Sequence, residues 1–117
     1  MKKLSALLMC SLALTGCLSQ PKEFVCEFSD HSGKTSLVIK GNAATFGKNE
    51  YPAKCSPMGN VAVYGAMKDS CRGGLDPKLD SWFLLYFDEV AGTLVLDEKS
   101  SAIGTREKYE YICKKAS

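Results

Sequence analysis

Turn-forming residues recur about every ten residues along this chain, and this spacing constrains the fold more than any other feature. Short runs rich in β-branched and aromatic residues lie between the turns and favour strands. After residue 17, no segment longer than about ten residues shows helical periodicity. The pattern predicts an all-β fold: a small antiparallel meander of about six to eight strands, closed as a barrel or stacked as a sandwich. The expected strands cover residues 23–28, 34–40, 43–46, 50–51, 61–67, 81–87, 93–96 and 106–115.

Two of the expected strands have informative faces. Residues 23–28 alternate, so that Phe24, Cys26 and Phe28 share one face, as in a strand with one side buried. Residues 81–87 are apolar on both faces, and we expect them to form the central strand of the core. The segments expected as loops are residues 68–80, 88–92 and 98–105, with Gly92 free to take a positive φ in a hairpin turn.

Of the six cysteines, Cys10 and Cys17 belong to the N-terminal segment considered below, and the other four can supply covalent constraints to a domain of about 100 residues, whose core is otherwise marginal. They allow three connectivities. We favour Cys26–Cys113, which would join the first and last strands, and Cys55–Cys71, which would close a central loop. In the chain-entropy model the larger loop contributes roughly 4–5 kcal/mol and the smaller roughly 3 kcal/mol. A zinc site is the alternative, but the cysteines lack metal-ligand spacing and His31 is the only histidine, so we expect no metal.

The N-terminal residues indicate export. An apolar run over residues 4–14 follows Lys2 and Lys3, and it is too short and too interrupted for a membrane-spanning helix. The sequence Leu-Thr-Gly-Cys at residues 14–17 resembles the lipobox of bacterial lipoproteins. The resemblance implies a signal peptide over residues 1–16, cleaved before Cys17, and acylation of that cysteine on its thiol and its new amino group, which anchors stably in a membrane.

This N-terminus sets the expected domain organisation. Residues 17–22 would form the acylated cysteine and a tether, and residues 23–117 a single β domain. Because Leu18 rather than an aspartate follows the cysteine, the resemblance to bacterial lipoproteins implies sorting to the outer membrane of a Gram-negative bacterium, facing the periplasm. An ordinary secretory signal with an incidental cysteine is the alternative.

The net charge argues against a nucleic-acid partner. Lys2 and Lys3 lie in the expected signal peptide, and without them 13 of the 15 basic side chains remain against 13 acidic ones. A mature chain with about zero net charge has neither the basic surface that nucleic acids require nor a polybasic membrane patch. We therefore expect contact with the membrane only through the lipid on Cys17, and a protein partner in the periplasm or outer membrane.

Candidate catalytic groups are few. A serine or cysteine nucleophile needs a base, and His31 lies among residues typical of a solvated turn. The adjacent carboxylates Asp88 and Glu89, and Asp97 and Glu98, could suggest a glycosidase. We expect both pairs at hairpin ends, where acidic residues favour turns and solubility. The chain is therefore predicted not to be an enzyme and to need no cofactor.

Two further motifs favour structural roles. Arg72 with Gly73 and Gly74 is too short for a phosphate loop and lacks the helix that follows one, so a disulfide-pinned surface loop is expected. Aromatic residues gather in the last third of the chain and are predicted to be core rather than a ligand cage; they are Trp82, Phe83, Tyr86, Phe87, Tyr109 and Tyr111.

The layout of the chain resembles the membrane-bound inhibitors of C-type lysozyme. The resemblance covers the lipobox, residues 24–46, and the placing of Cys26 and Cys113 in the first and last strands. It implies an eight-stranded barrel stapled between its ends. The inhibitory Ser-Gly-x-x-Tyr loop of that family is not present, the nearest string being residues 101–104, so no inhibitory residue carries over.

The predicted function is a non-catalytic binding or inhibitory module, with a lysozyme-like hydrolase as one candidate partner. The main alternative is an exclusion or toxin-immunity lipoprotein, of the kind that prophages carry, which blocks an envelope protein. A structural envelope component is the third possibility. Small size, a lipid anchor and the lack of a recognisable catalytic set fit all three.

Overall fold

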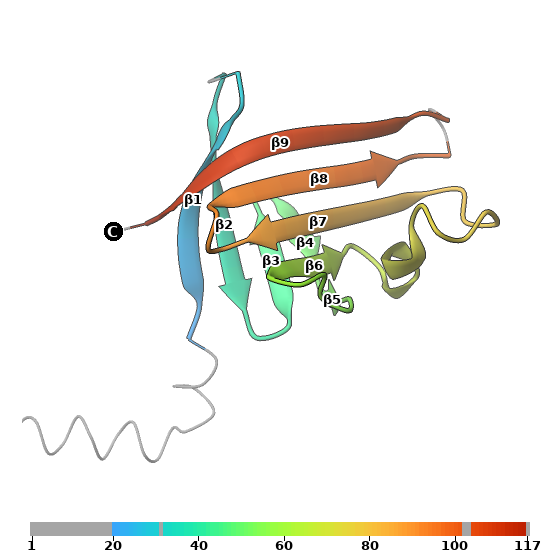
Figure 1. Ribbon diagram of the computed structural model, residues 1–117, viewed down its shortest axis with the longest axis horizontal. Coiled ribbons are helices and arrows are strands. Elements are labelled where there is room, and N and C mark those ends of the chain that lie inside the picture. Colours follow the sequence, from blue (N-terminus) through green and yellow to red (C-terminus); the bar gives the residue numbers. More distant parts are fainter. Residues whose placement is uncertain (1–19, 31, 102–103, 117) are drawn as a thin grey trace, which may run out of the picture.

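The computed structural model describes residues 20–30, 32–101 and 104–116, which form one antiparallel sheet of nine strands (Figure 1). The sheet curls into a nearly closed barrel, which confirms the predicted all-β fold. Within the described residues, the one helical element is a short 3-10 turn, and no helix there has the length and apolarity needed to cross a membrane. The strands are β1 (Lys22–Phe28), β2 (Lys34–Lys40), β3 (Ala43–Phe46), β4 (Asn49–Tyr51), β5 (Ala53–Lys54), β6 (Val61–Gly65), β7 (Trp82–Asp88), β8 (Thr93–Lys99) and β9 (Arg106–Lys115), and the 3-10 turn is η1 (Lys68–Arg72).

The ninth strand, β5, was not among the predicted strands. Pro52 lacks a backbone N–H and separates β4 from β5. The strand order is β4-β3-β2-β1-β9-β8-β7-β6-β5, so these two consecutive short strands are the two opposite edges of the sheet. The chain therefore passes from one edge to the other through a single residue, which holds the edges of the barrel together.

The first and last strands are neighbours, as predicted. β1 pairs with β2 on one side and with β9 on the other, and Cys26 lies directly opposite Cys113. A disulfide joins these two residues across 87 positions of sequence, and a second joins Cys55 to Cys71. Of the three possible connectivities, the structure has the one that the positions of the cysteines favoured.

The core inside the barrel follows the alternation of the strands. Its largest fully buried side chains are Leu37 on β2, Leu85 and Phe87 on β7, and Leu94 on β8. Phe24 packs edge-on against Phe87, with ring centroids 4.8 Å apart. Such aromatic pairs contribute roughly 0.5–1.5 kcal/mol beyond their burial. The predicted buried face of residues 23–28 is thus the inner face of β1.

A second core lies on the outer face of β6 and β7. Val63, Trp82 and Leu84 point away from the barrel interior and pack with the half-cystine Cys55. The covering segment, residues 66–81, connects β6 to β7 and includes η1. It lies so close to β7 that a Cβ on Gly73 would sit 2.4 Å from Cγ of Trp82. This cover explains why residues 81–87 are apolar on both faces: their inner side faces the barrel and their outer side faces the disulfide-closed segment.

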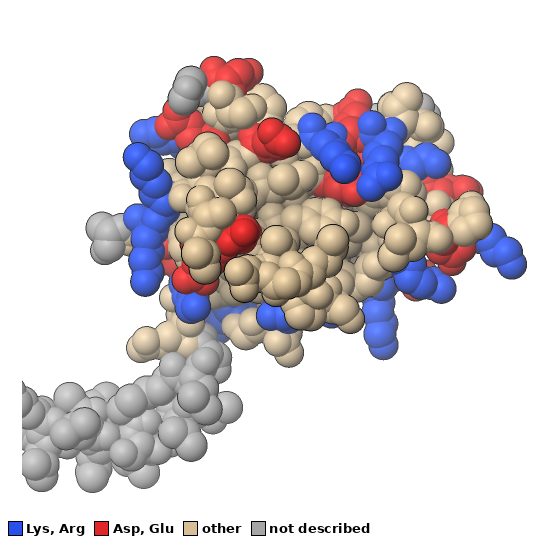
Figure 2. Space-filling view, in the orientation of Figure 1, with Lys and Arg blue, Asp and Glu red and all other residues tan. Residues whose placement is uncertain are grey.

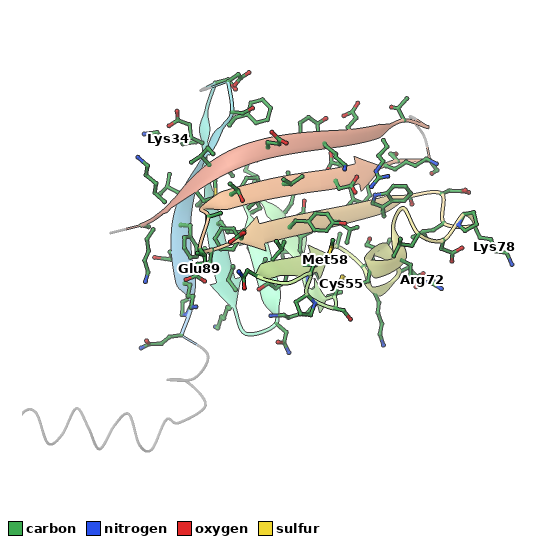
Figure 3. All side chains as sticks on the ribbon, viewed as in Figure 1. Lys34, Cys55, Met58, Arg72, Lys78 and Glu89 are labelled. Carbon is green, nitrogen blue, oxygen red and sulfur yellow. A yellow bond between two sulfur atoms is a disulfide. The ribbon has the colours of Figure 1, made fainter. Side chains whose placement is uncertain are left out.

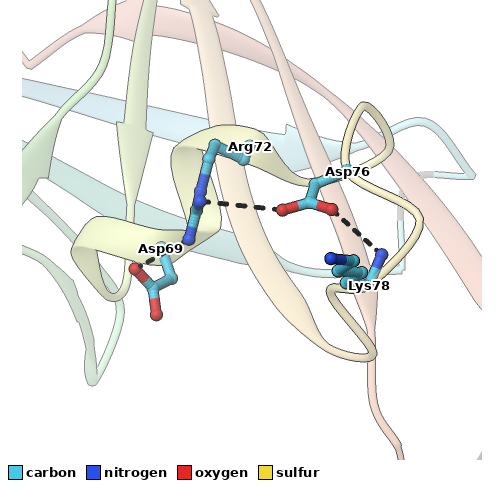
Figure 4. Close-up of polar contacts among 4 residues, drawn as sticks. All are labelled: Asp69, Arg72, Asp76 and Lys78. Carbon is cyan, nitrogen blue, oxygen red and sulfur yellow. Dashed lines mark hydrogen bonds and ion pairs between the residues drawn. The ribbon is translucent and has the colours of Figure 1, made fainter.

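Ion pairs around η1 hold the covering segment in shape. The Arg72 guanidinium lies 3.2 Å from Asp69 and 3.6 Å from Asp76, and Asp76 also accepts a 3.0 Å hydrogen bond from the backbone N–H of Lys78 (Figure 4). The sequence predicted a disulfide-pinned surface loop around Arg72, and the Cys55–Cys71 bond confirms it. The ion pairs and the disulfide therefore hold the covering segment in one conformation against the outer face of the sheet.

Two predicted strand ends differ from the structure by two residues or more. β6 ends at Gly65 rather than at residue 67, because the chain turns there so tightly that a Cβ on Gly65 would lie 2.9 Å from the Met67 carbonyl. β8 continues to Lys99, and its register with β9 runs to the Lys99–Arg106 pair. Asp97 and Glu98 are therefore strand residues and not part of a loop.

Candidate functional site: a groove on the outer face of the sheet

Of the described residues that the sequence singled out for catalysis, Asp88 and Asp97 line one cavity, but both carboxylates are engaged in other hydrogen bonds. Asp88 is the last residue of β7, at the start of the hairpin turn, and its side chain accepts a 2.9 Å hydrogen bond from the N–H of Ala91 in the turn, while Gly92 takes a φ of 71°. Glu89 pairs with Lys22 at 3.3 Å, and both side chains are exposed. These two carboxylates have the turn and surface roles that were predicted. His31 and Cys17 lie outside the described residues.

Asp97 corrects the expectation of an acidic hairpin end, because it is buried. Leu94 and Leu96 of β8 point into the barrel, so Asp97 points to the outer face, where it is only 1% exposed. Arg106 of β9 compensates for the buried charge: its Nε donates to Oδ1 at 2.9 Å and its Nη2 to Oδ2 at 2.7 Å. Trp82 Nε1 also donates to Oδ1, at 3.4 Å.

The electrostatic balance keeps Asp97 ionised. Burial alone raises the pKa of Asp97, but hydrogen bonds from Arg106 and Trp82, and the positive charges of Arg106 and Lys108, together lower its pKa below the ordinary value of 3.8. The same pair raises the pKa of Arg106 above its ordinary value, through the hydrogen bonds to Asp97 first and its charge second. This is a fully paired, charge-assisted contact, which is the condition under which a charge can be buried.

Arg106 is fixed from several sides, although 45% of its side chain is exposed. Its guanidinium carbon lies 5.4 Å from the centre of the Trp82 ring, and Lys99 Nζ lies 5.6 Å from the same ring. A Cβ on Gly74 would come within 3.2 Å of Arg106 Nη2, so the covering segment approaches it closely. Asp97 takes up Nε and Nη2, and Nη1 has no part in that pair.

Arg106 lies where two cavities meet. A cavity of about 480 Å³ has apolar walls from Met58, Val61 and Val95, and an adjacent cavity of about 470 Å³ extends to Leu75 of the covering segment. Both are lined by Met58, Tyr86 and Arg106, so they form one depression, called here the outer-face groove.

The groove has exposed apolar walls and a cationic rim. Met58 is 63% exposed and Leu75 84% exposed, although both belong to the groove wall; Figure 3 places Met58 close to Cys55, beside β6. Figure 2 shows basic side chains gathered over β8 and β9, where Lys99, Arg106 and Lys108 lie. Open apolar surface beside a fixed cation is typical of a binding site.

A second polar group lies on the inner face, at the end of β8 and β9. Glu98 is directly opposite Glu107 in the strand register, and Tyr109 donates a hydrogen bond to Glu107. Burial raises the pKa of Glu98 above its ordinary value of 4.5, with the charges of Glu107 and Asp97 adding to the effect. Burial, with Glu98 and Tyr111 nearby, raises the pKa of Tyr51 to about 12. Like charges directly opposite in a sheet destabilise it.

Glu98→Gln is expected to stabilise the fold at neutral pH, by roughly 0.2–1 kcal/mol, because it removes this repulsion. A carboxyl whose pKa is raised in the folded state costs stability once it ionises, so the wild type should gain stability as the pH falls from neutral towards 4.5, and the advantage of the variant should vanish there. Urea denaturation at both pH values measures this. Glu110→Gln is the matched control, because Glu110 faces Val95 rather than a carboxylate; an equal gain there would contradict the explanation.

The described residues contain no group of three or more side chains suited to hold a metal ion.

No protein-family model, curated protein or solved structure matches this chain. The fold and the groove alone describe the kind of protein: it is a disulfide-bonded antiparallel barrel with one covered outer face and a basic groove beside the covering segment. The resemblance to lysozyme inhibitors stays a prediction.

No motif or spacing in the sequence singled out Arg106. Asp97 was expected at a hairpin end, and Arg106 was simply the first residue of a predicted strand. The signal that could have found the site was the outward-facing Trp82 and Leu84, because apolar outward residues require a cover.

Proposed function

We propose that this protein is a lipid-anchored module of the outer membrane that faces the periplasm and binds a protein partner without catalysis. The observation that carries the proposal is Arg106, an exposed guanidinium held by the buried Asp97 between two apolar cavities. A side chain that is already ordered loses little further entropy on binding, so it favours recognition. The lipid anchor on Cys17 belongs to the same proposal and rests on the sequence resemblance.

Asp97, Asp88 and Glu89 support binding over catalysis. A general acid needs a raised pKa and access to the substrate, whereas Asp97 has a lowered pKa and both of its oxygens bond Arg106. Asp88 is committed to its turn, and Glu89 to an exposed ion pair with Lys22.

The first functional test is inhibition of a C-type lysozyme. The purified protein is added in increasing molar ratio to lysozyme acting on peptidoglycan, and turbidity is followed. Stoichiometric inhibition would support an inhibitory module. No effect at large molar excess would move the proposal to exclusion or immunity, which is tested by challenging expressing cells with phages and protein toxins. A chain that protects against none of these, and whose deletion makes the envelope permeable, would contradict the binding role and favour a structural one.

Cys17→Ala is expected to abolish acylation. Cells fed labelled palmitate should label the wild-type protein in the outer-membrane fraction and leave the variant unlabelled, because the thiol and amino group that would carry the acyl chains are those of Cys17. The matched control is Cys10→Ala, which changes the other N-terminal cysteine, inside the expected signal peptide. Equal labelling of the Cys17→Ala variant and the wild type would refute the anchor.

A further inference from the structure

The outer-face groove has the form of a site for an extended chain. Its two cavities, about 480 and 470 Å³, lie side by side and share Met58, Tyr86 and Arg106 as common walls. The groove crosses from Thr93 on β8 to Leu75 of the covering segment. In an extended peptide, alternate side chains point to the same side, about 6.5–7 Å apart. Two apolar side chains with one polar group between them would therefore match two cavities with one guanidinium between them.

The charged side chains of the groove indicate which polar group a bound chain would carry. Four charged residues line the groove: Arg106 and Lys108, and the carboxylates of Asp88 and Asp97. Asp97 is 1% exposed and Asp88 is hydrogen-bonded within its turn, whereas the Arg106 side chain is 45% exposed and Lys108 is exposed. Lys99 adds a third cation against the Trp82 ring. A ligand in the groove thus meets cations at its surface, and an anionic side chain complements them.

The Arg106 guanidinium is already oriented to bind a carboxylate. Its bidentate pair with Asp97 and its contact with Trp82 fix the plane of the guanidinium, and Nη1 lies outside that pair. Arginine presents a planar fork of donors that matches a carboxylate, and charge-assisted hydrogen bonds of this kind are about twice as strong as neutral ones.

We propose that the outer-face groove binds an extended acidic segment of a partner protein, with a carboxylate on Arg106 and an apolar side chain in each cavity. The proposal rests on the binding role above and names the chemistry of the partner. Trp82 is the single tryptophan of the chain and touches the site, so its fluorescence reports occupancy.

The test titrates the full-length protein in detergent micelles with a synthetic nonapeptide. Glutamate occupies the centre of the peptide, leucine lies two positions to either side, and serine fills the rest; a second peptide has glutamine at the centre. The glutamate peptide is expected to change Trp82 emission saturably, to bind more weakly as sodium chloride is raised, and to bind about tenfold or more tightly than the glutamine peptide. Equal binding of the two peptides, or no saturable change, would overturn the proposal.

Paired variants locate the contact. Lys108→Ala should weaken glutamate-peptide binding several-fold, and Asp97→Asn with Arg106→Gln should abolish it without leaving a buried unpaired charge. Lys114→Ala is the matched control, on the outer face of the same strand but outside the groove. Equal weakening by Lys114→Ala would mean that the attraction is unspecific, and saturation by inorganic phosphate alone would reassign the site to small anions; either result overturns the proposal. A protein that inhibits lysozyme but ignores both peptides would keep the binding function and lose this groove as its site.

Discussion

Arg106→Ala is expected to lower the free energy of unfolding by about 3 kcal/mol at neutral pH, the lower end of the range of about 3–5 kcal/mol for breaking a buried ion pair. The lower end applies because the Arg106 side chain is 45% exposed and its interaction with Asp97 is partly screened. The loss comes mainly from Asp97, which is 1% exposed in the wild type and would keep only Trp82 Nε1 as a side-chain hydrogen-bond donor among the contacts described above. Urea denaturation followed by Trp82 fluorescence measures the change.

The other member of the pair provides the control. Asp97→Asn should cost less, because it leaves a cation that water can reach, and the double variant Asp97→Asn with Arg106→Gln should recover much of the loss, since no buried charge remains. A double variant as unstable as Arg106→Ala would show that packing, and not the uncompensated carboxylate, is the cause.

The pH dependence of Arg106→Ala follows from the same pair. In the wild type the pKa of Asp97 is lowered, so its contribution to stability is present above the ordinary value of 3.8 and is lost as the pH falls through the folded pKa. In the variant, burial acts without Arg106 and raises the pKa, so the folded state gains stability as the pH falls. The two stabilities should therefore converge on acidification, and a gap that stays constant from neutral pH to pH 4 would contradict the electrostatic explanation.

Removing the Cys26–Cys113 disulfide should have the second large effect. Replacing both cysteines by alanine is expected to destabilise the protein by about 4 kcal/mol, because the bond closes a loop of 87 positions and restricts the unfolded chain. The hydrogen-bonded pairing of β1 with β9 remains, so the variant should fold to the same barrel at low temperature. Thermal unfolding by circular dichroism measures the loss.

The second disulfide is the matched control. It spans 16 positions and should contribute about 3 kcal/mol in the same model. Because Cys55 and Cys71 hold the covering segment against Trp82, replacing them should also weaken binding of the glutamate peptide. Replacing Cys26 and Cys113 should leave the affinity for this peptide unchanged at a temperature where the protein is folded. Equal effects of both pairs on peptide affinity would contradict this division of roles.

The fold could be predicted because its signals are local. The alternation of Phe24, Cys26 and Phe28 requires no knowledge of the neighbouring strands, and the same holds for the hairpin glycine Gly92. β5 could not be predicted, since a two-residue strand has no periodicity and exists only because β6 pairs with it.

The groove could not be predicted because it depends on register. Arg106 is directly opposite Lys99, and its side chain reaches diagonally to Asp97, a contact that no sequence spacing shows. The apolar residues on both faces of 81–87 did indicate that something must cover the outer face of this strand. The pattern was interpreted as a central strand, and the covering segment that it also implies was overlooked.

The pairing of β1 with β9 has a consequence for how the chain is made. Synthesis delivers Cys26 early and Cys113 almost last, with Cys55 and Cys71 between them. The sheet cannot be completed until its final strand is available, and during that interval Cys26 can form a wrong bond with Cys55 or Cys71. Folds with such distant pairings mature slowly. In an oxidising compartment this chain should therefore depend on an isomerase that reshuffles premature bonds, which makes its yield a measure of that catalyst's supply.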